Sequence, residues 1–155
     1  MTWTDYPRWA NTSLRNNADM NWGKLALASG ALLGAQVLHL VEVIVAGPVG
    51  IEGEGGIGEP LGLLGLIGAG LAMIAALNRR SYAIPLAIAS GVGVGVGFLL
   101  YHGAPIHSQL TNTYWGRGTV LDWAVVLLCV AAGAWAAKVA WEMRSSAALV
   151  GSRQR

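Results

Sequence analysis

Cysteine and charge are both scarce in this sequence, and each scarcity excludes a class of protein. Cys129 is the only cysteine, so an intrachain disulfide and Cys-x-x-Cys redox chemistry are both excluded. Charged residues make up 12% of the 155 residues and hydrophobic residues 54%, which is far more apolar than an ordinary soluble domain. The net charge of +2 does not indicate nucleic-acid binding, because the basic residues flank hydrophobic runs instead of forming one patch.

Four long apolar runs dominate what is present, and they cover residues 24–46, 61–77, 82–101 and 119–141. Each run has about the length of ~20 residues that crosses a hydrocarbon core, and the second is the shortest. Because a backbone in lipid must form its hydrogen bonds within its own segment, the runs are expected to be helices. We therefore predict an all-α polytopic membrane protein whose residues 24–144 form an antiparallel bundle of four transmembrane helices. Residues 1–23 are expected to form a polar, interfacial segment, and residues 145–155 a basic tail.

The basic residues predict the orientation of these helices. Nine of the ten Lys and Arg residues precede or begin the first run, separate the second from the third, or lie in the last turn of the fourth run or beyond it; the exception is Arg117. The positive-inside rule therefore places both termini on the cytoplasmic side of a plasma or cell inner membrane. The lipid bilayer is then the main partner. Six aromatic residues fall near the expected interfaces, as aromatic belts do: Trp22, Tyr82, Tyr101, Tyr114, Trp115 and Trp141.

Glycines predict close helix packing. In the third run they alternate with valine and form two pairs at i, i+4 spacing, Gly91/Gly95 and Gly93/Gly97, on nearly opposite helix faces; Gly30 and Gly34 form a similar pair in the first run. Small residues at this spacing let helix backbones approach one another in membranes. Packing within one bundle and self-association into a homo-oligomer are both open.

The outer side of the predicted bundle collects the residues capable of chemistry. In the first run, Gln36, His39 and Glu42 follow one another at i, i+3 and i+6 and share one broad helix face. Counted back from Pro48, Glu42 lies about 9 Å and His39 about 13 Å below the outer end of the run. Ionisable groups at such depth are costly, face the bundle interior and usually mark a functional site.

Three further outer residues complete the candidate metal-ligand set of His39, Glu42, His102, His107 and Asp122, with Gln36 as a supporting hydrogen-bonding partner. Mixed imidazole and carboxylate ligands suit zinc, copper(II), iron or manganese. Asp122 has a simpler alternative role, since an acid is favoured near a helix N-terminus. His107, in a loop with Gly, Ala and Pro, has the alternative of being a solvated loop residue.

Other chemistries fit less well. The methionines lie in the cytoplasmic half and Cys129 lies deep in the fourth run, so a copper(I) path, which needs sulfur ligands, is disfavoured. A haem held by His39 and His102 is less favoured than a metal ion, because the two differ in depth and Glu42 lies beside them. A buried polar clasp formed by His39, Glu42 and Gln36 is the non-metal alternative.

Three functions therefore remain open. The first is a small integral membrane metal-binding protein, working alone or as a subunit of a membrane oxidoreductase complex. The second is a non-catalytic accessory or scaffold subunit of a larger membrane complex that packs through its glycine-rich helices. The third is a proton-coupled carrier using Glu42, which is disfavoured because the inner halves of the helices offer almost no polar path. No residue can be assigned to catalysis, so enzyme activity stays undecided.

Overall fold

Four helices make up the fold in the part of the chain that the computed structural model describes, residues 21–46, 58–105, 113–116 and 118–152. They are α2 (Trp22–Ala46), α3 (Gly58–Leu77), α4 (Ala83–Gly103) and α5 (Val120–Ser152). Each contains a segment long and apolar enough to cross a membrane. Within the described residues, the prediction of an all-helical fold with four helices long and apolar enough to span a membrane is confirmed.

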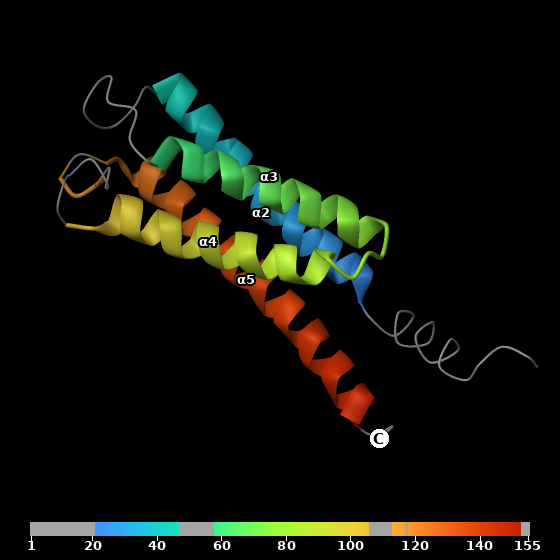
Figure 1. Cartoon of the computed structure of the whole chain (residues 1–155). Helices are drawn as coiled ribbons and strands as arrows, with labels where there is room; N and C mark the ends of the chain where they lie inside the picture. Colours follow the sequence, from blue (N-terminus) through green and yellow to red (C-terminus); the bar gives the residue numbers. More distant parts are fainter. Residues whose placement is uncertain (1–20, 47–57, 106–112, 117, 153–155) are drawn as a thin grey trace, which may run out of the picture.

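The helices surround a core of small side chains. α4 packs between α3 and α5, while α2 packs against α3 and α5 and contacts α4 only slightly (Figure 1). Alanines from all four helices, such as Ala28, Ala72, Ala87 and Ala136, are buried in the core, whereas most of the Leu, Ile and Val side chains point outward. This pattern suits a bilayer, where close packing of small residues holds helices together.

α4 and α5 approach each other closely at Gly91 of α4 and Gly133 of α5, named here the glycine contact. A Cβ added at Gly91 would lie 2.5 Å from the Gly133 carbonyl oxygen, and one added at Gly133 would lie 2.6 Å from the Gly91 oxygen. Both positions therefore require glycine, because backbone faces backbone there.

The other glycines of the two pairs predicted in α4 pack less closely than Gly91. Gly95 is buried on the same face as Gly91, but a Cβ added there would lie 3.8 Å from the Val130 carbonyl oxygen, which is an ordinary van der Waals contact. Gly93 and Gly97 lie on the exposed side of α4, where an added Cβ would meet nothing within 4 Å. Only one of the two predicted glycine faces thus packs within the described chain. Gly95 still lies at the contact between α4 and α5, because a Cβ added at Gly133 would lie 3.2 Å from the Gly95 amide nitrogen.

The two glycines of the pair in α2 also differ in how closely they pack. An added Cβ at Gly30 would lie 3.2 Å from the Met73 sulfur of α3, while at Gly34 it would meet nothing within 4 Å. Gly65 of α3 also fits tightly against its neighbours: its added Cβ would lie 2.6 Å from Cγ2 of Val94.

The basic residues Lys24, Arg79, Arg80, Lys138 and Arg144 mark one end of the bundle, called here the basic end. Arg79 adopts a left-handed conformation with φ of 52°. Its amide donates to the Ala76 carbonyl and the Arg80 amide donates to the Ala75 carbonyl, which closes the C-terminus of α3 as a Schellman motif. Arginine occupies a position where glycine is usual.

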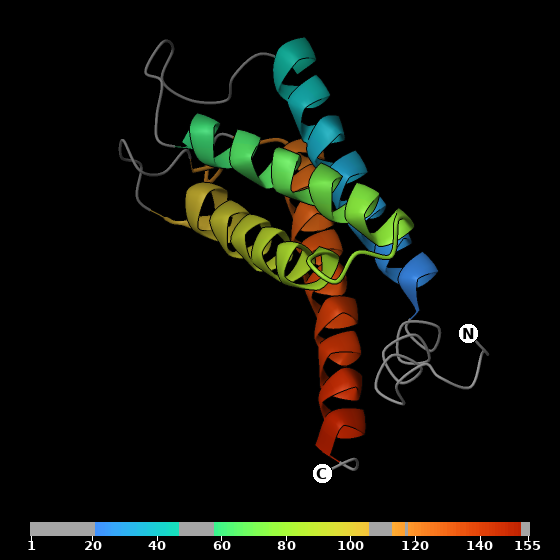
Figure 2. The same cartoon turned by 45° about the vertical axis from the view of Figure 1, so that its right-hand side comes forward.

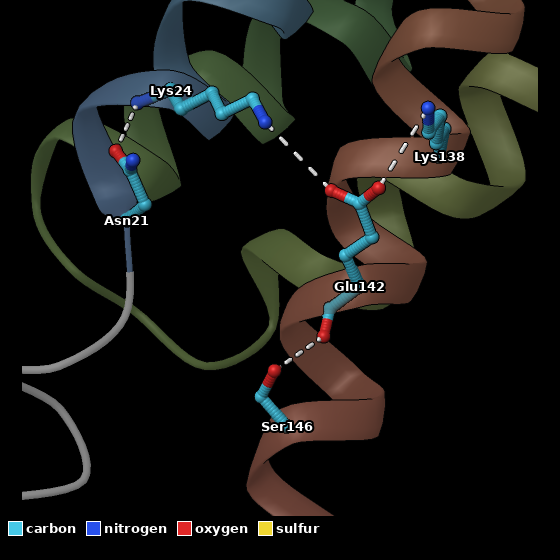
Figure 3. Close-up of polar contacts among 5 residues, drawn as sticks. All are labelled: Asn21, Lys24, Lys138, Glu142 and Ser146. Carbon is cyan, nitrogen blue, oxygen red and sulfur yellow. Dashed lines mark hydrogen bonds and ion pairs between the residues drawn. The ribbon is translucent and has the colours of Figure 1, made fainter.

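At the same end, the start of α2 lies beside the last third of α5. Glu142 of α5 lies between two lysines, with carboxylate oxygens 3.7 Å from Lys24 Nζ and 3.9 Å from Lys138 Nζ (Figure 3). The Lys24 amide also donates to Asn21 Oδ1 at 3.0 Å, which caps the start of α2. α5 continues to Ser152, past the predicted end of its span, because residues 147–149 are alanine and leucine, which favour helix.

Candidate functional site

Four of the predicted ligands converge at the end of the bundle opposite the basic end. His39 and Glu42 come from the last turns of α2, His102 from the last turn of α4, and Asp122 from the first turn of α5. Glu42, His102 and Asp122 are buried. With Tyr114 these residues form the polar cluster. The other predicted ligand, His107, lies outside the described residues.

Glu42 lies at the centre of the polar cluster. Its Oε2 lies 3.3 Å from Nδ1 of His39, and its carboxyl is near enough to that of Asp122 for the two to interact electrostatically. Nδ1 of His39 and both carboxylate oxygens of Glu42 are buried and lack a hydrogen-bond partner among the described residues. Buried polar atoms in that state are rare and call for an explanation such as a bound ion.

Aromatic rings surround His102. Its ring lies 5.3 Å from the His39 ring, 4.9 Å from Tyr101, 5.5 Å from Phe98 and 4.3 Å from Tyr114, centroid to centroid. His39 and His102 meet edge to face, and this direct contact leaves no room for a haem between the two rings.

Asp122 has a structural role as well as its place in the polar cluster. Its Oδ2 accepts a hydrogen bond from the Thr119 amide, and its own amide donates to Thr119 Oγ1 at 3.3 Å. This reciprocal pair is a capping box at the start of α5. The alternative role predicted for Asp122, at a helix N-terminus, is therefore present. A carboxylate can accept about four hydrogen bonds, so capping leaves acceptor capacity for a second partner.

Tyr114 is the cluster residue that the sequence analysis missed. It was expected in an interfacial aromatic belt, but its exposed fraction is 2% and its ring packs against His102 and Trp123. Its amide donates to the His102 carbonyl, and Trp115 Nε1 donates to the Gly103 carbonyl at 2.8 Å. The segment before α5 thus folds back over the end of α4 and satisfies carbonyl groups there.

Glycines allow this turn. Gly116 has a φ of 73°, and a Cβ added at Gly118 would lie 2.6 Å from Cβ of Tyr114. Burial, followed by the charges of Glu42 and Asp122, raises the pKa of Tyr114 far above its usual range, so the phenol stays neutral at physiological pH. No sequence signal marks Tyr114, because loop residues follow no hydrophobic periodicity.

Within the described chain, neither Gln36 nor the ligand set as a whole has the arrangement of a formed metal site. Gln36 is buried, but its Nε2 donates to the Leu32 carbonyl at 3.5 Å and its Oε1 faces Gly65 of α3, so its recorded contacts are with α2 and α3. Among the described residues, no three His, Cys, Asp or Glu side chains are arranged to hold one metal ion together. The polar cluster therefore brings ligand types together without a preformed coordination geometry.

Comparisons with known proteins give no further guide to this cluster, since no protein-family model, no curated protein and no solved structure matches the chain.

Proposed function

We propose that the chain is a small integral membrane protein that binds a divalent transition-metal ion in the polar cluster. The observation that carries the proposal is that His39 Nδ1 and both oxygens of Glu42 are buried without a hydrogen bond in the described chain, with His39 Nδ1 only 3.3 Å from Glu42 Oε2. A second carboxylate, Asp122, lies against them, and all lysines and arginines with described side chains lie toward the basic end. Two neighbouring carboxylates at hydrocarbon depth need a cation or a proton to balance their charge.

The ligand chemistry favours a transition metal over calcium or magnesium. The cluster offers imidazole nitrogens together with carboxylate oxygens, a mixture that suits zinc, copper(II), iron or manganese. His39 and Glu42 supply the first two ligands from adjacent turns of α2. Asp122 or His102 supplies the third after its side chain rotates toward them. Whether such a site belongs to a larger oxidoreductase complex stays a prediction from the sequence.

The test is the metal content of the purified full-length protein after incubation with zinc, copper(II), iron(II) or manganese(II). Elemental mass spectrometry measures this content. We expect stoichiometric binding of one of these, and loss of most of it in His39→Ala and in Glu42→Gln. Glu142→Gln is the matched control, because it removes a carboxylate at the opposite end. His107→Ala tests the predicted ligand outside the described residues. Substoichiometric metal that neither cluster substitution changes would refute the proposal.

A second candidate is the scaffold function, in which the polar cluster only holds helices together. It is favoured by the capping role of Asp122 and by the ring packing around His102. In that case Glu42→Gln leaves the metal content unchanged but alters stability, and gentle extraction recovers the protein with partner subunits. The same preparations therefore separate the two candidates.

The proposed topology is an antiparallel bundle in the plasma membrane, with both termini on the cytoplasmic side. It is supported by the basic residues that follow α3 and end α5, and by the contact of Lys24 at the start of α2 with Glu142 near the end of α5. Reporter domains fused to each terminus test it. Activity of a periplasmic or extracellular reporter at either terminus would overturn the orientation, which places the polar cluster near the outer face.

A further inference from the structure

A groove at the basic end lies far from the polar cluster. The first turns of α4 and the preceding turn contribute Ser81, Ile84, Pro85 and Ile88, and α5 contributes Arg144 and Ala147. Its volume is about 380 Å³, within the range of roughly 300–1,000 Å³ typical of ligand pockets. Figure 2 shows that α5 continues well beyond the start of α4.

The groove crosses the depth at which lipid headgroups begin. Arg144 lies 24 residues beyond the start of α5 at Val120, or about 36 Å of helix rise. A hydrocarbon core is only about 30 Å thick, so Arg144 reaches the headgroup layer when α5 spans it. Trp141, which is exposed and whose ring lies 5.7 Å from the Arg144 guanidinium carbon, is a residue typical of that interface. Ile84, Pro85 and Ile88 extend from there toward the apolar interior.

The charge of the groove is positive and is not neutralised by the described chain. Glu142, the nearest acid in sequence, is directed at Lys24 and Lys138 (Figure 3). No ion pair joins Arg144 to a carboxylate among the described residues. Arg79 and Arg80 immediately precede Ser81 and add positive charge at the same end. A guanidinium above an apolar wall matches a phosphate carried on an acyl chain.

We propose that this groove binds an anionic phospholipid. Its phosphate accepts hydrogen bonds from the Arg144 guanidinium and the Ser81 hydroxyl, and its acyl chain lies along Ile84, Pro85 and Ile88. The inference is independent of the metal proposal, because it shares no residue with the polar cluster. It also holds for either orientation of the protein in the membrane.

Native mass spectrometry of the full-length protein in detergent tests this inference, with phosphatidylglycerol or phosphatidylcholine added. We expect one retained phosphatidylglycerol per chain and little phosphatidylcholine. Loss of a charge-assisted hydrogen bond predicts retention weaker by about tenfold or more in Arg144→Gln. Lys138→Gln is the matched control, since it removes an exposed charge from the same helix outside the groove. Ala147→Trp keeps the charge and fills the groove, so it should also lose the lipid.

Several results would overturn the inference. Equal retention of both lipids would show an apolar surface without headgroup selectivity. Equal weakening in Arg144→Gln and Lys138→Gln would show a diffuse charge effect. Binding of inorganic phosphate or glycerol phosphate as tight as that of the lipid would show a site for a soluble anion, and a dimer without lipid would show that a second copy covers the groove. Circular dichroism confirms that each variant is folded before its lipid content is compared.

Discussion

The glycine contact and the polar cluster hold the helices together by opposite means. At the glycine contact, α4 and α5 touch backbone to backbone, because neither Gly91 nor Gly133 has a side chain. At the polar cluster, large rings fill the space at the end of α4, where the buried Tyr114 ring lies 4.3 Å from the His102 ring. The first arrangement depends on the absence of atoms, and the second on their presence. Substitutions should therefore destabilise the protein when they add volume at the glycine contact or remove volume at the polar cluster.

The largest expected effect is the loss of volume in Tyr114→Ala. Removing a buried aromatic side chain costs about 3–5 kcal/mol in protein cores, because the space it leaves does not fully collapse. The exposed Tyr82, 57% of whose surface is accessible, is the matched control and should change stability little. Unfolding in mixed detergent micelles, followed by tryptophan fluorescence, measures both. If Tyr114→Ala is no worse than Tyr82→Ala, the polar cluster does not depend on its rings.

Added volume at the glycine contact is expected to rank second. Gly91→Ala places a Cβ 2.5 Å from a backbone oxygen of α5, so the helices must move apart. Overpacking of this kind costs about 1–3 kcal/mol. Gly93→Ala, two residues away with nothing within 4 Å, should be neutral or should stabilise α4, because alanine favours helix by up to about 1 kcal/mol.

Thermal denaturation of these two variants in the same detergent gives the comparison directly. Equal loss of stability would mean that the exposed face of α4 also packs closely, for instance against a second copy of the chain. Stabilisation by Gly93→Ala together with loss in Gly91→Ala would confirm that only one glycine face is used.

The same two regions show which features of the fold and the site could be predicted from the sequence. Hydrophobic run length predicted the four helices, and the i, i+3 spacing predicted that His39 and Glu42 share a face, because both signals are local in the sequence. Gly133 was not singled out, since it has no glycine partner at i+4 and its contact is with another helix. Tyr114 could not be found either, because its burial depends on a turn that folds back over α4.

A smaller effect is expected from removing the cap that positions Asp122. Thr119→Ala deletes the hydroxyl that accepts a hydrogen bond from the Asp122 amide. Loss of a helix N-cap costs about 0.5–2 kcal/mol. Thr119→Ser, which keeps the hydroxyl, is the matched control. If the serine variant is as unstable as the alanine variant in the same denaturation assay, the capping box does not stabilise α5.

The smallest expected effect appears only at alkaline pH and separates the chemistry of Tyr114 from its volume. The pKa of the phenol is raised in the folded protein, by burial first and by the charges of Glu42 and Asp122 second. A tyrosine in the unfolded chain has a pKa of about 10. Above that pH the folded protein therefore binds this proton more tightly than the unfolded chain does. The contribution of the neutral phenol is therefore complete below about pH 10 and declines as the pH rises toward the folded pKa.

Tyr114→Phe keeps the ring but removes the titrating group, so it should lose less stability than the parent protein between about pH 9 and pH 11. Tyr82→Phe is the matched control, because it removes a hydroxyl from a tyrosine that is mostly exposed. Melting temperatures of the three proteins across this range give the comparison. Identical pH profiles for the parent and Tyr114→Phe would show that the phenol meets solvent. The ring would then serve the polar cluster only as packing, as small residues do at the glycine contact.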